Sequence, residues 1–84
     1  MKISAPRNLE RRKTMLRFVY DYTAKAGEPP TVREIGKASS LSSISTTAGY
    51  LNRMVNAGLL TRNPHRERKY CVTKAGEYYL QETA

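Results

Sequence analysis

The sequence predicts a mainly α-helical fold with a small β-ribbon, and three observations lead to that prediction. Residues 27–60 hold two short helical patterns separated by a tight polar turn. After Gly58 the pattern changes to two short runs that favour β-strands. The formal net charge is +8 and the sequence pI is about 10.0. A winged helix-turn-helix accounts for all three: three helices, a two-stranded wing and a short C-terminal helix.

Size and composition limit the classes of protein that fit. We predict a single domain over residues 1–84, with the helix-turn-helix at about 31–58, the wing at about 59–73 and the C-terminal helix at about 74–82. No apolar run approaches the roughly 20 residues that cross a bilayer, and the N-terminus MKISAPRNLERRK lacks a signal-peptide stretch. We therefore expect a soluble protein of the cytoplasm, associated with the nucleoid.

The inventory of reactive side chains is short. Cys71 is the single cysteine, so an internal disulfide is excluded, and together with His65 it offers too few ligands for zinc. Because Cys71 falls in a predicted strand, we interpret it as a buried, inert thiol. No nucleophile–base arrangement or phosphate-cradling glycine loop is recognisable. We expect no enzymatic activity, no catalytic residue, no metal and no cofactor.

The first helix is predicted from Leu9 to Ala26, with Asn8 as its N-cap. Gly27 and the two prolines that follow end it. Its apolar arc spans about half the circumference, so we expect it to be covered on two flanks, by the helix-turn-helix and by the C-terminal segment. The arc comprises Leu9, Met15, Leu16, Phe18, Val19, Tyr20, Tyr22 and Thr23.

The second helix is predicted to start at residues 31–34, whose sequence Thr-Val-Arg-Glu is typical of a capping box. Ile35 and Ala38 give this helix its inner face. It ends near residues 39–40, and Leu41 is expected to plug the turn.

The third helix is predicted to begin near Ser42 or Ser43 and to stop at Gly58. The many serines and threonines between positions 39 and 47 could instead indicate a low-complexity linker, but a regular apolar seam favours a helix. The seam consists of Ile44, Ala48, Leu51 and Val55, with Thr47 and Met54 beside it.

The last part of the chain is predicted to form the wing and a final helix. Residues 59–62 and 69–73 suit two β-strands, joined by a polar turn at 63–67. Thr73 is expected to cap the C-terminal helix, which carries Tyr78, Tyr79 and Leu80.

The predicted outer face of the third helix carries small hydroxyl and amide side chains. Such groups can reach the donors, acceptors and thymine methyl groups on base edges in the DNA major groove. Gly49 would allow a close approach to DNA, although a tolerated surface glycine explains it equally well. The residues predicted to contact bases are Ser43, Ser45, Thr46, Gly49 and Arg53.

Phosphate contacts are predicted around that face. The start of the second helix offers free N–H groups and the positive end of a dipole, and the wing carries several cations. A further basic cluster, Arg7, Arg11, Arg12 and Lys13, lies before and within the first helix. The residues predicted to contact the DNA backbone are Thr31, Val32, Arg33, Ser42, Asn52, Arg66, Arg68 and Lys69.

Four segments carry a family resemblance: FVYDY at 18–22, GEPPTVREIGKA at 27–38, LSS at 41–43, and Leu51 and Met54 followed by GLL at 58–60. Together they resemble the N-terminal winged-helix domain of LexA-type SOS repressors, and PPTVREI is the most specific match. The resemblance implies a bacterial or phage repressor that binds a palindromic operator as a homodimer, with the third helix in the major groove. The family's base-contacting positions fall on Ser43, Ser45, Thr46, Ala48 and Gly49.

The chain also departs from that family. Ser39-Ser40 stands where the family usually has Leu-Gly, and the family's acidic or histidine positions become Ala48, Gly49 and Tyr50, so the operator sequence does not transfer. The self-cleaving domain with its Ser-Lys dyad has no counterpart in these 84 residues. A stand-alone regulator and a piece of a longer protein both fit. Residues 75–76 match the family's scissile Ala-Gly, but their surroundings look more like the last helix of MarR- or PadR-type regulators, and we interpret them as structural.

Two other functions compete with DNA binding. The wide apolar arc of the first helix and the tyrosines 78–79 could form a docking surface, which would make the chain a winged-helix protein–protein interaction module. A structural RNA-binding role is weaker, because no aromatic stacking platform is predicted on the recognition face.

Overall fold

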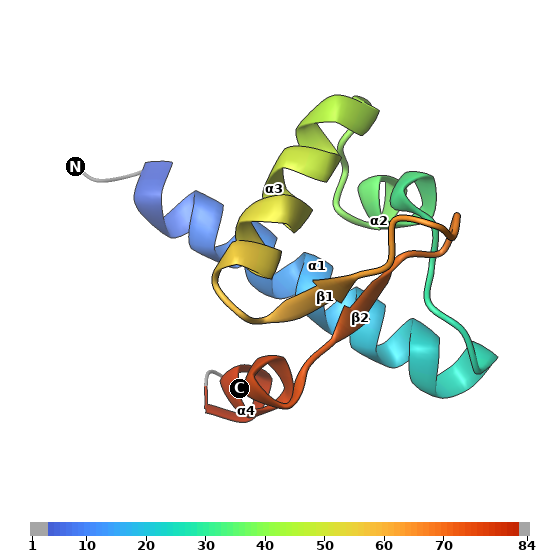
Figure 1. Ribbon diagram of the computed structural model, residues 1–84. Coiled ribbons are helices and arrows are strands. Elements are labelled where there is room, and N and C mark those ends of the chain that lie inside the picture. The colour runs from blue at the N-terminus through green and yellow to red at the C-terminus, as the bar shows by residue number, and fades with distance from the viewer. Residues whose placement is uncertain (1–3, 83–84) are drawn as a thin grey trace.

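The computed structural model describes residues 4–82, with side chains from residue 10 onward, and in that range it contains four helices and a two-stranded antiparallel sheet. In chain order these are α1 (Ser4–Ala26), α2 (Val32–Ala38), α3 (Ile44–Asn56), β1 (Leu60–Arg62), β2 (Tyr70–Val72) and α4 (Lys74–Glu82). The helix α1 crosses the molecule, with α2 and α3 on one side of it and α4 on the other (Figure 1). This is the predicted winged helix-turn-helix. No helix among the described residues is long and apolar enough to span a membrane.

The helix α1 begins at Ser4, earlier than the sequence predicted. Asn8 therefore lies inside the helix and is not its N-cap, so that prediction was wrong. Pro6 falls in the first turn, where backbone N–H groups have no acceptor within the helix and the missing N–H of proline costs nothing. The helix can consequently extend through a residue that normally stops one.

The inner side of α1 provides much of the core. Met15, Leu16 and Val19 are fully buried, and α1 contacts both helices of the helix-turn-helix as well as β2 and α4. The expected cover on two flanks is thus confirmed. Tyr20 is 38% exposed, so its place in the apolar arc was wrong: it lies at the edge of the contact with β2 and α4.

The capping box at the start of α2 is confirmed. The Thr31 N–H donates to Glu34 Oε1 at 2.8 Å, and the Glu34 N–H donates to Thr31 Oγ1 at 3.1 Å. Ile35 is buried as expected, but Ala38 is exposed, contrary to the prediction. The buried positions of α2 are Ile35 and Gly36, because α3 approaches the helix at the glycine.

The contact between Gly36 and Thr47 fixes how closely α2 and α3 pack. A Cβ atom at position 36 would lie 2.8 Å from Thr47 Oγ1, closer than real Cβ contacts allow. The Thr47 hydroxyl is held in place because it donates to the Ser43 carbonyl oxygen at 2.9 Å. A side chain at position 36 would therefore push the two helices apart.

The buried stripe of α3 differs from the predicted seam. Its fully buried members are Thr47, Leu51 and Met54, whereas Ala48 is half-buried and Ile44 is 48% exposed. The assignment of Ile44 to the core face was therefore wrong. One stripe at spacings of four and three residues suffices to contact α2, α1 and β1, and Ile44 precedes the region where α2 covers α3.

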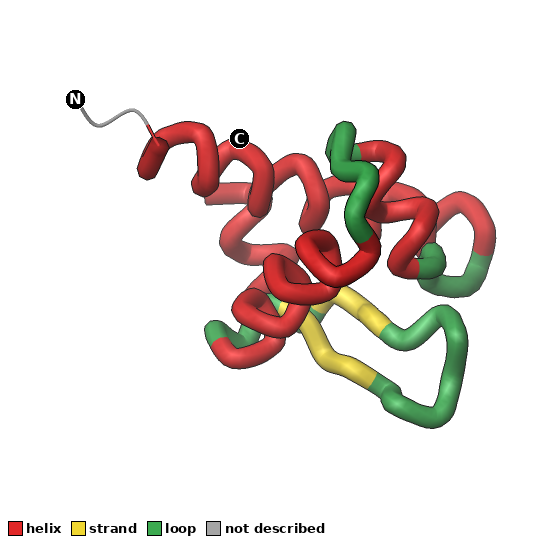
Figure 2. The backbone as a smooth tube through the Cα atoms, turned by 90° about the horizontal axis from the view of Figure 1, so that it is seen from above, coloured by secondary structure: helices red, strands yellow, loops and turns green. Residues whose placement is uncertain are grey.

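The wing is a short antiparallel ribbon in which Leu60 pairs with Val72 and Arg62 pairs with Tyr70. Its loop extends from the body of the molecule (Figure 2) and is closed where the Asn63 N–H donates to the Lys69 carbonyl oxygen at 2.8 Å.

Cys71 is exposed, not buried as predicted. Successive strand residues point to opposite faces. Because Tyr70 is the buried residue of β2, Cys71 must face outward.

The helix α4 closes the core from the other side. Thr73 caps it as predicted, accepting the Gly76 N–H at 3.0 Å. A Cβ at Gly76 would collide with the Leu59 carbonyl oxygen, so the Ala-Gly pair at 75–76 serves the packing of α4. Leu80 is 4% exposed and Tyr79 packs against the core. The buried core consists of Met15, Leu16, Val19, Ile35, Leu51, Met54, Leu60, Tyr70 and Leu80.

Candidate nucleic-acid interface

The face of α3 opposite its buried stripe is open and uncharged. Ser45, Gly49, Asn52 and Asn56 follow one another at spacings of four, three and four residues, which places them on one line along the helix. Ser45, Asn52 and Asn56 are exposed, and a Cβ added to Gly49 would meet no atom within 4 Å. This line is called the outer face below.

The predicted base contacts Ser43, Ser45, Thr46 and Arg53 are also exposed. Ser43 has a structural role as well, because its Oγ caps α3 by accepting the Thr46 N–H at 3.2 Å. The Ser43 hydroxyl hydrogen can still be donated outward. The structure thus brings the predicted base-contacting residues together on the first turns of α3 and beside its outer face.

Two polar side chains farther along α3 have neighbours that orient them. The Tyr70 hydroxyl donates to Asn52 Oδ1 at 2.8 Å, which leaves the Asn52 amide group able to donate to a ligand. The Arg53 guanidinium lies 5.6 Å from the centre of the Tyr50 ring. Both contacts hold a donor against the helix surface.

The predicted backbone contacts lie on three elements. Thr31 and Val32 are half-buried at the start of α2, and Arg33 is exposed there. Ser42, just before α3, and Asn52, on α3, are both exposed. On the wing, Arg66 is exposed and Lys69 is half-buried.

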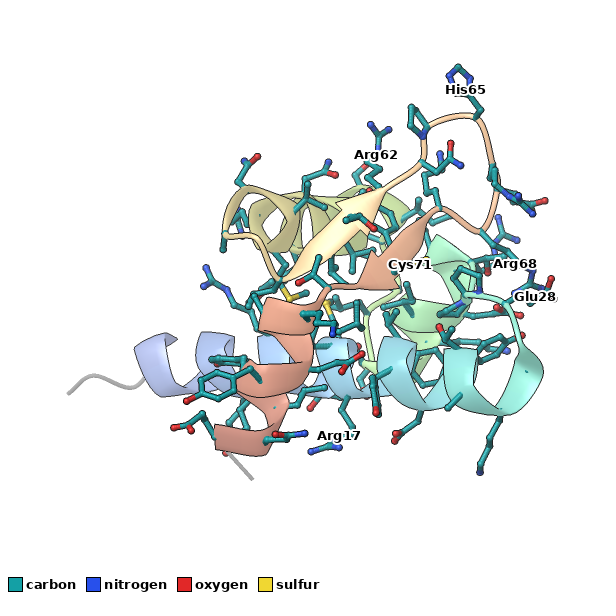
Figure 3. The ribbon with its side chains drawn as sticks, turned by 60° about the horizontal axis from the view of Figure 1, so that its bottom comes forward. Arg17, Glu28, Arg62, His65, Arg68 and Cys71 are labelled. Carbon is teal, nitrogen blue, oxygen red and sulfur yellow. The ribbon has the colours of Figure 1, made fainter. Side chains whose placement is uncertain are left out.

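Arg68 has a different environment from the other wing cations. Its Nη1 donates to Glu34 Oε1 at 2.9 Å, to the Pro29 carbonyl oxygen at 3.0 Å and to the Tyr22 hydroxyl at 3.2 Å. Its Nε lies 3.4 Å from Glu28 Oε2, and Figure 3 shows the two side chains next to each other. The side chain is 30% exposed. These contacts tie the wing loop to the loop between α1 and α2.

The charges in this cluster influence one another. The backbone N–H of Thr31, together with the Arg68 guanidinium, holds the pKa of the Glu34 carboxyl below its ordinary value. The hydrogen bond to Glu34, assisted by Tyr22, raises the pKa of Arg68. Glu34 therefore serves both the cap of α2 and the attachment of the wing, and it remains ionised at neutral pH.

Two adjoining hollows lie between α2, the start of α3 and the wing. The first has a volume of about 310 Å³, and the second lies on the wing side. Val32, Arg33 and Ile44 line both. The other lining residues are Gly36, Lys37, Leu41, Ser42, Ser43 and Thr47 in the first, and Thr31, Glu67 and Lys69 in the second.

Sequence reasoning missed three residues on this side of the molecule. Ile44 had been assigned to the core, and Lys37 and Arg62 had no assigned role. Lys37 lines the first hollow, and Arg62 projects from β1 away from α1 (Figure 3). Alternation along β1 places Arg62 on the same face as the buried Leu60, so no local signal marks its exposure, and none marks the other two.

Within the basic cluster on α1, Arg11 lines a hollow with Ser39 and Ser40, at the turn between α2 and α3. The side chain of Arg7 lies outside the described residues, and Arg11, Arg12 and Lys13 are half-buried. Arg17 is exposed and projects from the side of α1 that faces away from the wing (Figure 3). Among the residues whose side chains are described, no group of three metal-ligating side chains comes together.

Comparison with known proteins gives one consistent result. A family model described as LexA DNA binding domain matches residues 8–69. The chain is 45% identical over 71 residues to the LexA repressor of Lacticaseibacillus casei, covering 84% of this chain and 34% of that protein. It is 42% identical over 76 residues to the LexA repressor of Enterococcus faecalis, covering 90% of this chain and 36% of that protein. The chain thus spans about a third of the length of these curated relatives.

Proposed function

The chain belongs to the LexA DNA-binding domain family, and from that premise we propose that it is a sequence-specific, double-stranded DNA-binding transcriptional regulator, a repressor. In this proposal α3 enters the major groove, and the start of α2 and the wing contact phosphates. Such a protein acts in the cytoplasm, at the nucleoid. The proposal includes no enzymatic step.

The observation that supports this proposal best is the composition and exposure of the outer face of α3. Its side chains are short, polar and uncharged, so they can approach base edges without bulk or charge repulsion. The nearest long side chain, Arg53, offers a bidentate donor for guanine or a phosphate. Ser45 and Thr46 are exposed in the first turns of α3, although serine and threonine are weaker helix formers than the residues that usually cover a solvated face.

Cations on neighbouring elements frame that face. Arg33 and Lys37 on α2 are exposed, and Arg62 and Arg66 are exposed on the wing. Each phosphate that such a cation neutralises releases counterions, which makes binding fall steeply as salt rises. We therefore assign most of the affinity to these residues and to Lys69, and the sequence preference to Ser43, Ser45, Thr46 and Gly49.

In this proposal Arg68 positions the wing loop and does not contact a phosphate. Its guanidinium is already bonded to Glu34 and to the Pro29 carbonyl oxygen. The contact holds the wing loop against the α1–α2 connection. Arg66 lies two positions before Arg68 and Lys69 one position after it. The contact would therefore hold both cations in fixed positions relative to α3.

We further propose that two copies of the chain bind a palindromic operator, as the family resemblance implies. In this arrangement each α3 reads one half-site, and the two grooves face the same side of the duplex. Measurement of the mass of the complex on one operator duplex tests the stoichiometry, and a single copy per operator would contradict it.

A titration on two duplexes tests the assignment of roles. Selection from a random pool supplies a preferred duplex, and a scrambled duplex serves as the reference. Arg66→Ala is expected to weaken binding to both duplexes alike and to reduce the salt slope by about 1. Thr46→Ala is expected to change the preference between them by about 1–3 kcal/mol.

Arg17→Ala is the matched control, because it removes an exposed cation on the side of α1 that faces away from the wing. It should leave both affinities nearly unchanged. Equal losses on the two duplexes for Thr46→Ala would contradict the assignment of base contacts. A loss for Arg17→Ala as large as that for Arg66→Ala would show that the interface lies elsewhere.

The rival function, a protein–protein interaction module, loses its main support. Met15, Leu16 and Val19 of the α1 arc are fully covered by the rest of the fold, and Tyr79 and Leu80 pack against the same core. Tyr78 remains 64% exposed on α4. Mobility shifts on mixed genomic fragments discriminate the two functions, because only a DNA-binding protein retards them.

A further inference from the structure

The first residue of α3 is an aliphatic side chain that the fold leaves half uncovered. Ile44 is 48% exposed, and the other exposed large hydrophobic residues among the described ones are Tyr20 on α1 and Tyr78 on α4. Those two carry hydroxyl groups that water can solvate, whereas Ile44 has only carbon atoms to present. Among the described residues it is therefore the one large aliphatic side chain that is exposed on the proposed recognition side.

The packing of α2 against α3 explains why Ile44 is not buried. The two helices approach each other at Gly36 and Thr47, nearly one turn beyond Ile44. The side chain therefore reaches into the two hollows between α2, α3 and the wing. Val32 is the apolar residue that shares both hollows with it.

The surroundings of Ile44 favour an anionic partner. Arg33 lines both hollows, Lys37 lines the first and Lys69 the second, and Glu67 is the acidic residue among the lining residues. A purely apolar ligand would gain nothing from three cations at its border. A polyanion that also carries an apolar group on its surface fits both features.

Duplex DNA has such a group. In the major groove each base edge presents donors or acceptors, and the thymine C5-methyl is the apolar exception. We propose that Ile44 contacts the C5-methyl of a thymine in each half-site and thereby contributes to sequence preference. This inference rests on the proposed function, and it adds a specificity residue that the hydroxyl and amide groups of α3 do not supply.

Replacing thymine by uracil tests the contact, because uracil lacks only the methyl group. In the selected duplex each thymine is replaced singly, and affinities are measured for the wild-type chain and for Ile44→Ala. At one thymine position in each half-site, the replacement is expected to weaken wild-type binding about fourfold. This is the effect of removing one methyl group from an apolar contact. The Ile44→Ala chain is expected to bind the thymine and uracil duplexes equally.

Two controls accompany the titration. Ser45→Ala removes a neighbouring polar group of α3 and should keep the fourfold discrimination, and Ile44→Val, which keeps a branched apolar side chain, should keep part of it. Thermal unfolding of Ile44→Ala checks that the variant is folded, and because half of the side chain is already exposed, we expect a small change.

The possible failures are distinguishable. If the wild-type chain binds the selected duplex and tolerates uracil at every position, or if Ile44→Ala keeps the full discrimination, the methyl contact is refuted and DNA binding stands. A selected site without thymine in its half-sites also refutes it. If no duplex is enriched from the pool, the proposed function itself fails, and the inference fails with it.

Discussion

Replacing Gly49 by alanine separates the stability of α3 from its approach to DNA. Gly49 lies in the middle of α3, and an added Cβ would meet no atom of the protein within 4 Å. Glycine in a helix interior is about 1 kcal/mol less favourable than alanine. The free chain should therefore become more stable by about 1 kcal/mol, which corresponds to a rise in Tm of about 4–8 °C for a domain of this size.

The same methyl group should oppose binding if the backbone of α3 comes close to base edges. Inserting a methyl into a well-packed contact costs about 1–3 kcal/mol, or roughly 5- to 150-fold in Kd. We expect Gly49→Ala to have a higher Tm than the wild type and to bind the selected duplex more weakly. Thermal unfolding and fluorescence anisotropy on one preparation measure both effects.

Gly36→Ala is the contrasting variant, since there the Cβ would lie 2.8 Å from Thr47 Oγ1. Gly36→Ala should lower Tm, although it adds the same methyl group as Gly49→Ala. If Gly49→Ala melts higher and binds as tightly as the wild type, the close approach is refuted and Gly49 is only a tolerated surface glycine. If Gly49→Ala melts lower, position 49 does not have the open space on α3 that the stability argument requires.

Three further predictions concern other parts of the chain. Ser40 has a φ of 60°, so Ser40→Gly should raise the stability measured by urea unfolding by about 1 kcal/mol, and a lower midpoint would contradict this. Because the folded pKa of Glu34 is lowered, its charge contributes to stability above the ordinary glutamate pKa of about 4.3, and this contribution is lost as pH falls through the folded value. The difference in unfolding midpoint between the wild type and Glu34→Gln should therefore shrink on acidification. A constant difference would refute the role of the charge. The exposed Cys71 should react with a thiol reagent in the native state, whereas reaction only in denaturant would mean that it is buried.

Features that depend on neighbouring residues could be predicted from the sequence. The capping box at Thr31 and Glu34 and the cap at Thr73 each bond residues three positions apart, so the pattern contains both partners. The wing strands follow from two short runs on either side of a polar turn. Local rules were sufficient for these elements.

Apart from the N-cap assigned to Asn8, the wrong predictions concern residues whose environment is set by distant partners. Ile44 and Cys71 were both assigned to the interior, because an apolar residue in a helix or strand is usually buried. Whether each one is covered depends on where α2 contacts α3 and on Tyr70 taking the inner face of β2.

Arg68 illustrates the same limit for charged residues. In sequence it is one of several wing cations, but its partners Glu34 and Tyr22 lie 34 and 46 positions away. No periodicity or spacing links residues at such separations. Its role depends on the wing loop lying beside the α1–α2 connection.

The most direct test of the central claim, that the outer face of α3 enters duplex DNA, is an NMR titration of the isotope-labelled chain with the selected duplex. The largest changes in amide chemical shift are expected on Ser45, Thr46 and Gly49 and on wing residues 63–69. Amides of α4 around Tyr78 should change little. Changes concentrated on α4 and the adjoining side of α1, with the amides of α3 unaffected, would contradict the account.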